Sequence, residues 1–325
     1  MGQMRTFDWD AKPTPRLGFG CGGVLGRVGR RDSLRAMAAA WEAGVRLFDT
    51  ARSYGYGEAE GLLGEFLRGR REQAIVVTKF GIVPHPLPRW KRAARPLVRA
   101  VLKVLPAARD RVRSEVAAPQ PHFNVQTLRS SLETSLRQLQ TDYVDVLLAH
   151  EASVSLMAED DLMAELQEIL REGKARRVGI SASAQDAANV SSHGPELLSV
   201  VQFPGYPLDA HPWNPSSAPT RLRMVNHPFG GVTRGSAALH ALAAMAEDTA
   251  VDSVLGEKLL GDARERLAEV VFASLLETTG ADVIVPSMLH PQSVRANVAA
   301  IDSERFSSKE LALVRSRLQA SDAGL

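Results

Sequence analysis

Hydrophobic and polar positions follow two periods that alternate along this chain. Short apolar, β-branched runs predict strands over 17–21, 74–79, 143–149, 175–181, 198–203, 222–227 and 282–286, with a further strand that ends at Asp49. Between and after them, helical spacing of apolar residues predicts helices over 32–42, 59–67, 124–139, 160–172, 184–192, 260–279, 291–301 and 308–319. Strands that alternate with helices, without a break in composition, favour a closed parallel barrel.

The N-terminal residues 4–16 are short, polar and interrupted by Pro13 and Pro15, which predicts a small hairpin before the first barrel strand. A length of 325 residues permits two average domains, but α/β barrels often use about 250 residues as one. We therefore predict one domain over residues 1–325. Its fold class is α/β, a (β/α)8 TIM barrel with the N-terminal hairpin and a basic helical insertion after the third strand.

The insertion covers residues 82–122, which is too long for an ordinary strand-to-helix loop. Between Arg89 and Arg113 there are nine basic residues and one acidic residue, Asp110, interleaved with apolar positions. We interpret the segment as a helical lid over the barrel mouth, with its basic face in water. The alternative is a surface for anionic substrates or for anionic lipid at a membrane, because basic amphipathic helices favour both.

Composition narrows the classes of protein. Hydrophobic residues make up 45% and charged residues 23%, which is ordinary for a soluble globular chain, and a net charge of +2 gives no reason to expect nucleic acid. The single cysteine, Cys21, excludes a disulfide framework and a cysteine metal site. Without a signal-peptide pattern or a long apolar run, a reducing cytoplasmic location is expected.

A glycine-rich segment at Gly18–Gly23 matches G-x-G-x-x-G, and the strand ending at Asp49 follows a predicted helix. This pattern imitates the start of a dinucleotide-binding Rossmann fold, which is the alternative fold and predicts an open sheet. However, the glycine loop continues to Gly29, and the acid comes about 30 residues after the first glycine instead of about 20. The barrel is favoured, with the glycines letting the backbone pass close beneath a cofactor.

Four polar residues lie at or just beyond three predicted strand ends. Asp49 ends one strand and Tyr54 follows in the loop, whereas Lys79 and His150 end two later strands. In an α/β barrel such ends converge on the catalytic face. A phenol has an ordinary pKa of about 10, and a cation beside it makes its proton easier to release. Taken singly, these residues could also be a structural ion pair, a loop tyrosine and a core histidine.

The segments FDTARSYG, VVTKFG and DYVDVLLAH, in this order, resemble those of the aldo-keto reductases, and the resemblance extends from about Leu17 to Asn297. It implies hydride transfer between NAD(P)H and an aldehyde or ketone, or the reverse oxidation of the alcohol. It also implies that Tyr54 is the general acid or base, that Lys79, held by Asp49, lowers the pKa of the phenol, and that His150 orients the small-molecule substrate. The alternative is a regulatory or docking subunit with the same barrel and little turnover.

The resemblance further implies residues that bind a nicotinamide cofactor. Ser181 and Gln202 match ligands of the nicotinamide carboxamide. Ala182 stands where the family has an asparagine that contacts the same group, and Asn226 occupies the usual place of an aromatic that stacks on the nicotinamide ring. His227 and Phe229 are alternative stacking residues. The remaining candidates are the glycine-loop residues Gly20, Cys21 and Gly22, and the phosphate and adenine residues Ser287, Met288, Ser293 and Asn297.

The 2′-phosphate of NADP lacks its usual ligands in this sequence. Ser287 and Ser293 stand where many relatives have lysine and arginine, and Arg295 is a nearby candidate to replace them. The family as a whole favours NADP, and NAD remains the alternative. No metal is predicted, because the histidines lack paired ligand spacing.

Overall fold

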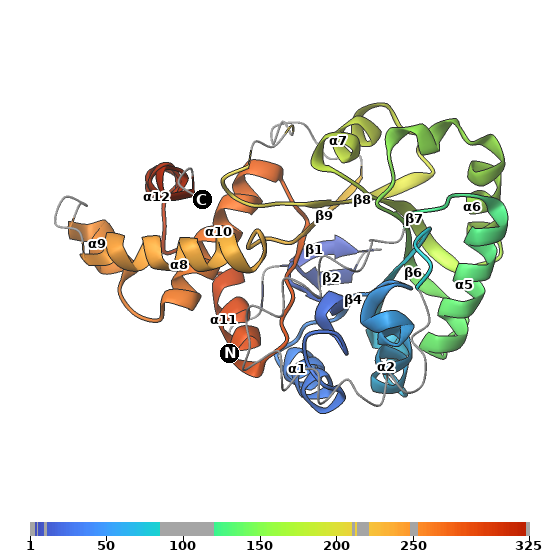
Figure 1. Ribbon diagram of the computed structural model, residues 1–325, viewed down its shortest axis with the longest axis horizontal. Coiled ribbons are helices and arrows are strands. Elements are labelled where there is room, and N and C mark those ends of the chain that lie inside the picture. Colours follow the sequence, from blue (N-terminus) through green and yellow to red (C-terminus); the bar gives the residue numbers. More distant parts are fainter. Residues whose placement is uncertain are drawn as a thin grey trace.

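The computed structural model describes residues 4, 6–9, 12–84, 120–209, 212, 221–247 and 253–322. Its centre is an eight-stranded parallel sheet in which neighbours in the chain are neighbours in space (Figure 1). The strands are β3 (Gly18–Gly20), β4 (Leu47–Asp49), β5 (Ile75–Phe80), β6 (Val144–His150), β7 (Ala175–Ser181), β8 (Leu198–Pro204), β9 (Leu222–Asn226) and β10 (Val283–Val285).

The first and last strands meet, which turns the sheet into a barrel. Leu17 forms a parallel bridge with Ile284. On either side of it, the N–H of Ile284 donates to Arg16 O, and the N–H of Gly20 donates to Pro286 O, both at 2.9 Å. The predicted (β/α)8 barrel is confirmed, and the open sheet that a Rossmann fold requires is excluded.

Helices surround the barrel (Figure 1). They are α1 (Arg30–Glu42), α2 (Ala59–Phe66), α5 (Val125–Leu139), α6 (Asp160–Arg171), α7 (Ala184–His193), α8 (Gly231–Glu247), α9 (Ser253–Leu259), α10 (Ala263–Thr279), α11 (Pro291–Ile301) and α12 (Ser308–Asp322). Local side-chain chemistry fixes where two of these helices begin. Asn124 caps α5 by accepting a hydrogen bond from the N–H of Thr127, and Pro291 occupies the first turn of α11.

The predicted elements of the barrel agree with the structure to within a few residues at their ends. The larger difference lies after β9, where α8 and α9 occupy a region that the sequence pattern left unassigned, and the helix predicted from residue 260 begins at Ala263. The apolar positions of α8 are rich in alanine, so they give a weak periodic signal. Figure 1 shows α8, α9 and α12 together on one side of the barrel.

The N-terminal hairpin is confirmed as β1 (Thr6–Trp9) paired antiparallel with β2 (Lys12–Pro15). Phe7 and Trp9 are buried in the same apolar cluster as inward-facing barrel residues such as Val77. A second and larger cluster lies between the sheet and the helices. The hairpin therefore contributes apolar side chains to the barrel interior.

Most of the basic insertion, including all of 89–113, lies outside the described residues, so the lid interpretation remains a prediction. The two described ends of the insertion meet, because the N–H of His122 donates to Gly81 O at 2.8 Å. Among the described helices, none combines the length and the apolar character that a membrane crossing requires.

Candidate active site

The barrel interior changes from apolar to polar in one step at the carboxyl end of the strands. Leu47, Val77, Leu148, Val200 and Met224 belong to a single buried interior cluster. Side chains two positions apart point to the same face of a strand, so the next inward residue on each of these strands can be read directly from the sequence. These residues are Asp49, Lys79, His150, Gln202 and Asn226.

Lys79 and Asp49 form a buried ion pair. The Nζ atom of Lys79 lies 2.5 Å from Oδ1 of Asp49 and 3.0 Å from Thr50 O. The exposed fractions are 1% for Lys79 and 3% for Asp49, so water takes little part in this contact. Burial alone lowers the pKa of Lys79, but Asp49 and Tyr54 outweigh it and raise the pKa above its ordinary value. The ammonium is therefore charged at neutral pH.

Tyr54 begins a short 3-10 turn in the loop that follows β4. The chain reverses there through left-handed backbone at Gly55 and Tyr56, whose φ angles are 59° and 61°. A Cβ atom on Gly55 would lie 2.8 Å from Val24 O, so the turn requires glycine at that position. This turn brings the Tyr54 ring over the barrel interior, where its centre is 5.0 Å from Lys79 Nζ.

The pKa of Tyr54 is raised above its ordinary value. Burial is the largest cause, and the charge of Lys79 opposes it without cancelling it. The sequence-based expectation that Lys79 lowers the phenol pKa therefore describes one contribution and not the net direction. The phenol is protonated at neutral pH, so it is a proton donor in the free protein.

His150 completes the group around the phenol. Its ring meets the Tyr54 ring edge to face, with ring centres 5.8 Å apart, and the residue is 8% exposed. Burial lowers the pKa of His150 to about 3, and the charges of Lys79 and His227 act in the same direction. His150 is thus a neutral imidazole at physiological pH and has one N–H to donate.

Gln202 links the carboxylate of Asp49 to the residues that are predicted to bind the carboxamide of the cofactor. Its Nε2 donates to Oδ1 of Asp49 at 3.1 Å, while its Oε1 accepts from Ser181 Oγ at 2.9 Å and from Asn226 Nδ2 at 3.2 Å. The Oδ1 atom of Asn226 is buried and has no hydrogen-bond partner among the described residues. Such an atom is costly to bury unless a ligand or water donates to it.

His227 and Phe229, the predicted stacking residues, take different places. His227 has left-handed backbone with φ of 51°. Burial is the largest cause that lowers its pKa; the charge of Asp49 acts against this, whereas those of Arg27 and Lys79 add to it. His227 therefore lies within electrostatic reach of the polar layer. Phe229 instead packs against Phe272 with ring centres 5.8 Å apart and lines a neighbouring cavity.

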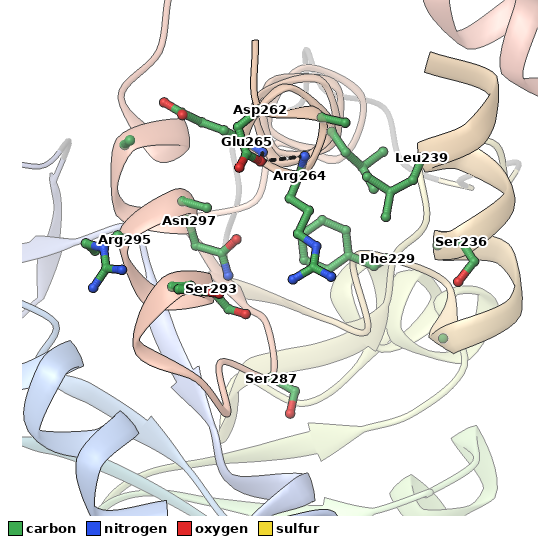
Figure 2. Close-up of a pocket in the computed structure, with 17 residues that line it drawn as sticks. Phe229, Ser236, Leu239, Asp262, Arg264, Glu265, Ser287, Ser293, Arg295 and Asn297 are labelled. Atoms are coloured by element: carbon green, nitrogen blue, oxygen red, sulfur yellow. Dashed lines mark hydrogen bonds between the residues drawn. The ribbon is translucent and has the colours of Figure 1, made fainter. Parts of the chain in front are cut away.

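That cavity has a volume of about 970 Å³ and lies between α8, α10 and the segment from β10 to α11 (Figure 2). Its lining includes four of the predicted cofactor residues, namely Phe229, Ser287, Ser293 and Asn297. Met288, by contrast, has a fully buried side chain in the hydrophobic core. The volume and the mixed polar lining suit one half of a dinucleotide.

The glycine loop lies beside Tyr54 at the mouth of the barrel. A Cβ atom on Gly22 would lie 3.8 Å from Cζ of Tyr54, and one on Gly20 would lie 3.0 Å from Pro286 O. Cys21 between them is buried, and burial raises the pKa of its thiol. The thiol is therefore protonated and contributes packing rather than reactivity.

Sequence reasoning missed two residues of this region. Asn226 was noted only for the aromatic that it replaces, although it follows Met224 by two positions and so continues the inward face of β9. Arg264, at the start of α10, lines the cavity. No sequence signal marked Arg264, because its approach to the cavity depends on how α10 packs against α11.

Comparisons with known proteins agree with this architecture. A sequence model of the Aldo/keto reductase family matches residues 16–213. The "Probable aldo-keto reductase 1" of Glycine max is 27% identical over 193 residues, which cover 58% of this chain and 47% of that protein. A D-threo-aldose 1-dehydrogenase of a Pseudomonas species is 28% identical over 179 residues, which cover 53% and 51%.

A solved structure supports the same fold. An aldo/keto reductase from Klebsiella pneumoniae, in complex with NADP and acetate, superposes with a TM-score of 0.63 over 98% of this chain and 96% of that one, at 21% identity. The chain belongs to the aldo/keto reductase family. It spans about half the length of the curated relatives it matches.

Proposed function

We propose that this protein transfers a hydride between a nicotinamide cofactor and an aldehyde or ketone, or the corresponding alcohol, with Tyr54 as the general acid or base. The observation that carries the proposal is the meeting of Tyr54, Lys79, Asp49 and His150 at one end of the barrel. The substrate class is also that of the related D-threo-aldose 1-dehydrogenase, and the cofactor is that of the Klebsiella pneumoniae structure.

The residues present fit a nicotinamide dinucleotide. Ser181 and the unpartnered Oδ1 of Asn226 offer acceptors for a carboxamide NH2, beside the amide of Gln202. The cavity lined by Phe229 and Asn297 offers room for the adenosine half. When bound, the reduced cofactor supplies the hydride.

The chain's own residues then handle the proton. As the carbonyl oxygen gains negative charge, Tyr54 donates its hydroxyl proton to that oxygen. The neutral imidazole of His150 donates a hydrogen bond to the same oxygen, which stabilises the developing charge and fixes the orientation of the substrate. The charged Lys79 stabilises the tyrosinate that remains, and Asp49 holds Lys79 in place. In the reverse direction, the tyrosinate removes the alcohol proton.

A single-turnover experiment tests the proposal. Enzyme loaded with NADPH is mixed with a panel of aldehydes and ketones, and oxidation of the cofactor is followed with NADPH and with NADPH deuterated at the transferred position. We expect turnover with at least one carbonyl and a slower rate for the deuterated cofactor, because a hydride moves. Tight cofactor binding with no turnover across the panel would instead favour the regulatory or docking subunit.

A further inference from the structure

We infer that Arg264 binds the 2′-phosphate of NADP(H) and so makes the protein prefer NADP(H) to NAD(H). This inference rests on the proposed function only in taking the cavity as the place of the adenosine half. It concerns a residue on a helix outside the segment from 286 to 297, where the sequence resemblance places the phosphate contacts. In that segment the family's usual cations are replaced by Ser287 and Ser293.

Arg264 lies where the adenine end of the cofactor is proposed to bind. The residue lies at the start of α10 and lines the same cavity as Asn297, the predicted adenine ligand, and Ser293. Figure 2 shows its side chain pointing from α10 into the space between Asn297 and Phe229. The 2′-phosphate is attached to the ribose next to the adenine, so a guanidinium close to the adenine ligand is correctly placed to meet it.

Arg295, the candidate from the sequence, also lines the cavity but is less well placed. Figure 2 shows its side chain on the opposite side of α11 from Phe229 and Ser236. Within the part of the chain that the structure describes, no acidic residue forms an ion pair with Arg264 or with Arg295. The two arginines therefore differ in where their side chains point and not in their ion pairing, and the direction of the side chain favours Arg264.

The acidic residues at the cavity do not neutralise Arg264. Oδ1 of Asp262 accepts hydrogen bonds from the backbone N–H groups of Arg264 and Glu265, at 2.9 and 3.1 Å, and so caps α10. Glu265 pairs with Arg266 at 3.4 Å. Both carboxylates have donors of their own, which leaves the guanidinium available to an anion.

The chemistry of the two groups matches. A guanidinium has a fork of N–H donors that can hold a phosphate by two parallel hydrogen bonds. The hydroxyl of Ser293 in the same cavity can add a further, uncharged donor. NAD(H) carries only a ribose hydroxyl at this point, so the loss of Arg264 affects one cofactor far more than the other.

The test uses the full-length protein and measures dissociation constants for NADP+, NAD+, adenosine 2′,5′-bisphosphate and adenosine 5′-monophosphate. The last two ligands lack nicotinamide, so their binding does not depend on carbonyl reduction. Wild type should bind NADP+ at least about tenfold more tightly than NAD+, equivalent to about 1.4 kcal/mol. Arg264→Gln should weaken NADP+ and the bisphosphate by about tenfold or more and leave NAD+ and the monophosphate within about twofold.

Arg295→Gln is the matched control and should leave the preference unchanged. Arg264 is solvent-exposed, so neutralising it is not expected to unfold the protein. The inference is overturned if Arg295→Gln abolishes the preference, if Arg264→Gln weakens all four ligands equally, or if wild type has no preference. If the Arg264-dependent preference is found but no carbonyl is reduced, the inference stands and the proposed function fails.

Discussion

The side-chain amide of Gln202 donates a hydrogen bond of 3.1 Å to Oδ1 of Asp49, a residue 153 positions earlier in the chain. The same carboxylate oxygen accepts from Lys79. At its other end, Gln202 accepts from Ser181 and Asn226. One residue therefore links the group around Tyr54 to the residues proposed to hold the carboxamide through hydrogen bonds.

Removal of Gln202 should destabilise the fold more than removal of one of its partners. Gln202→Leu leaves the donors of Ser181 and Asn226 without their acceptor in a buried site, which costs about 1–3 kcal/mol for each such group. Ser181→Ala removes one donor and leaves Gln202 with its other contacts. We expect the loss in the free energy of unfolding, measured by urea denaturation, to be several-fold larger for Gln202→Leu than for Ser181→Ala. Equal losses would show that the hydrogen bonds of Gln202 contribute little.

The buried ion pair should be more costly to break than to remove. Lys79→Met leaves the carboxylate of Asp49 buried without its ammonium, and we expect a loss of about 3–5 kcal/mol in the free energy of unfolding. The double variant with Asp49→Asn removes the uncompensated charge and should recover part of the loss. A double variant at least as unstable as Lys79→Met would contradict a charge-based explanation.

His150 should make the fold sensitive to acid. Its pKa falls from 6.5 in the unfolded chain to about 3 in the folded protein, so the unfolded state binds a proton first as the pH falls. The associated stability is complete above pH 6.5 and is lost as the pH falls towards 3. Between about pH 7.5 and about pH 5 the expected loss is about 2 kcal/mol.

The variant His150→Asn isolates this contribution, because other titrating groups are common to both proteins. The free energy of unfolding of wild type should decline more steeply over this interval than that of the variant. Parallel curves would mean that His150 titrates near its ordinary value in the folded state, and the neutral imidazole assigned to the site would be wrong.

With Tyr54 as the proposed general acid or base, its raised pKa predicts different pH dependences for the two directions of reaction. Carbonyl reduction uses the protonated phenol, so its single-turnover rate should be constant across neutral pH. Alcohol oxidation uses the tyrosinate, so its rate should rise with pH beyond the ordinary phenol pKa of about 10. An oxidation rate that levels off near neutrality would indicate that Lys79 lowers the pKa more than burial raises it.

The sequence predicts the barrel and the meeting of Asp49, Lys79 and His150 at one of its faces, and the reason is physical. Parallel strands with buried faces have strongly apolar runs, and a polar residue that ends such a run stands out, as Asp49, Lys79 and His150 do. Because the carboxyl ends of barrel strands share one face, the convergence of these residues follows from the fold. Tyr54 is added by the turn at Gly55.

What the sequence does not predict depends on contacts between distant segments. The net pKa of Tyr54 is a balance between burial and a charge, and a sequence gives the charge but not the depth of burial. The hydrogen-bond network of Gln202 depends on the register of neighbouring strands. Arg264 reaches its cavity only because α10 packs against α11. The helix α8, which also borders the cavity, is rich in alanine and lacks the periodicity that would have revealed it as a helix in the sequence.

The most direct test of the central claim replaces Tyr54 with phenylalanine and measures the single-turnover rate of carbonyl reduction with bound NADPH. Tyr56→Phe is the matched control, because Tyr56 lies two residues away and is 48% exposed. The account predicts a rate about 10²–10⁴-fold lower for Tyr54→Phe, with cofactor binding retained, and an almost unchanged rate for Tyr56→Phe. An unchanged rate for Tyr54→Phe would contradict it.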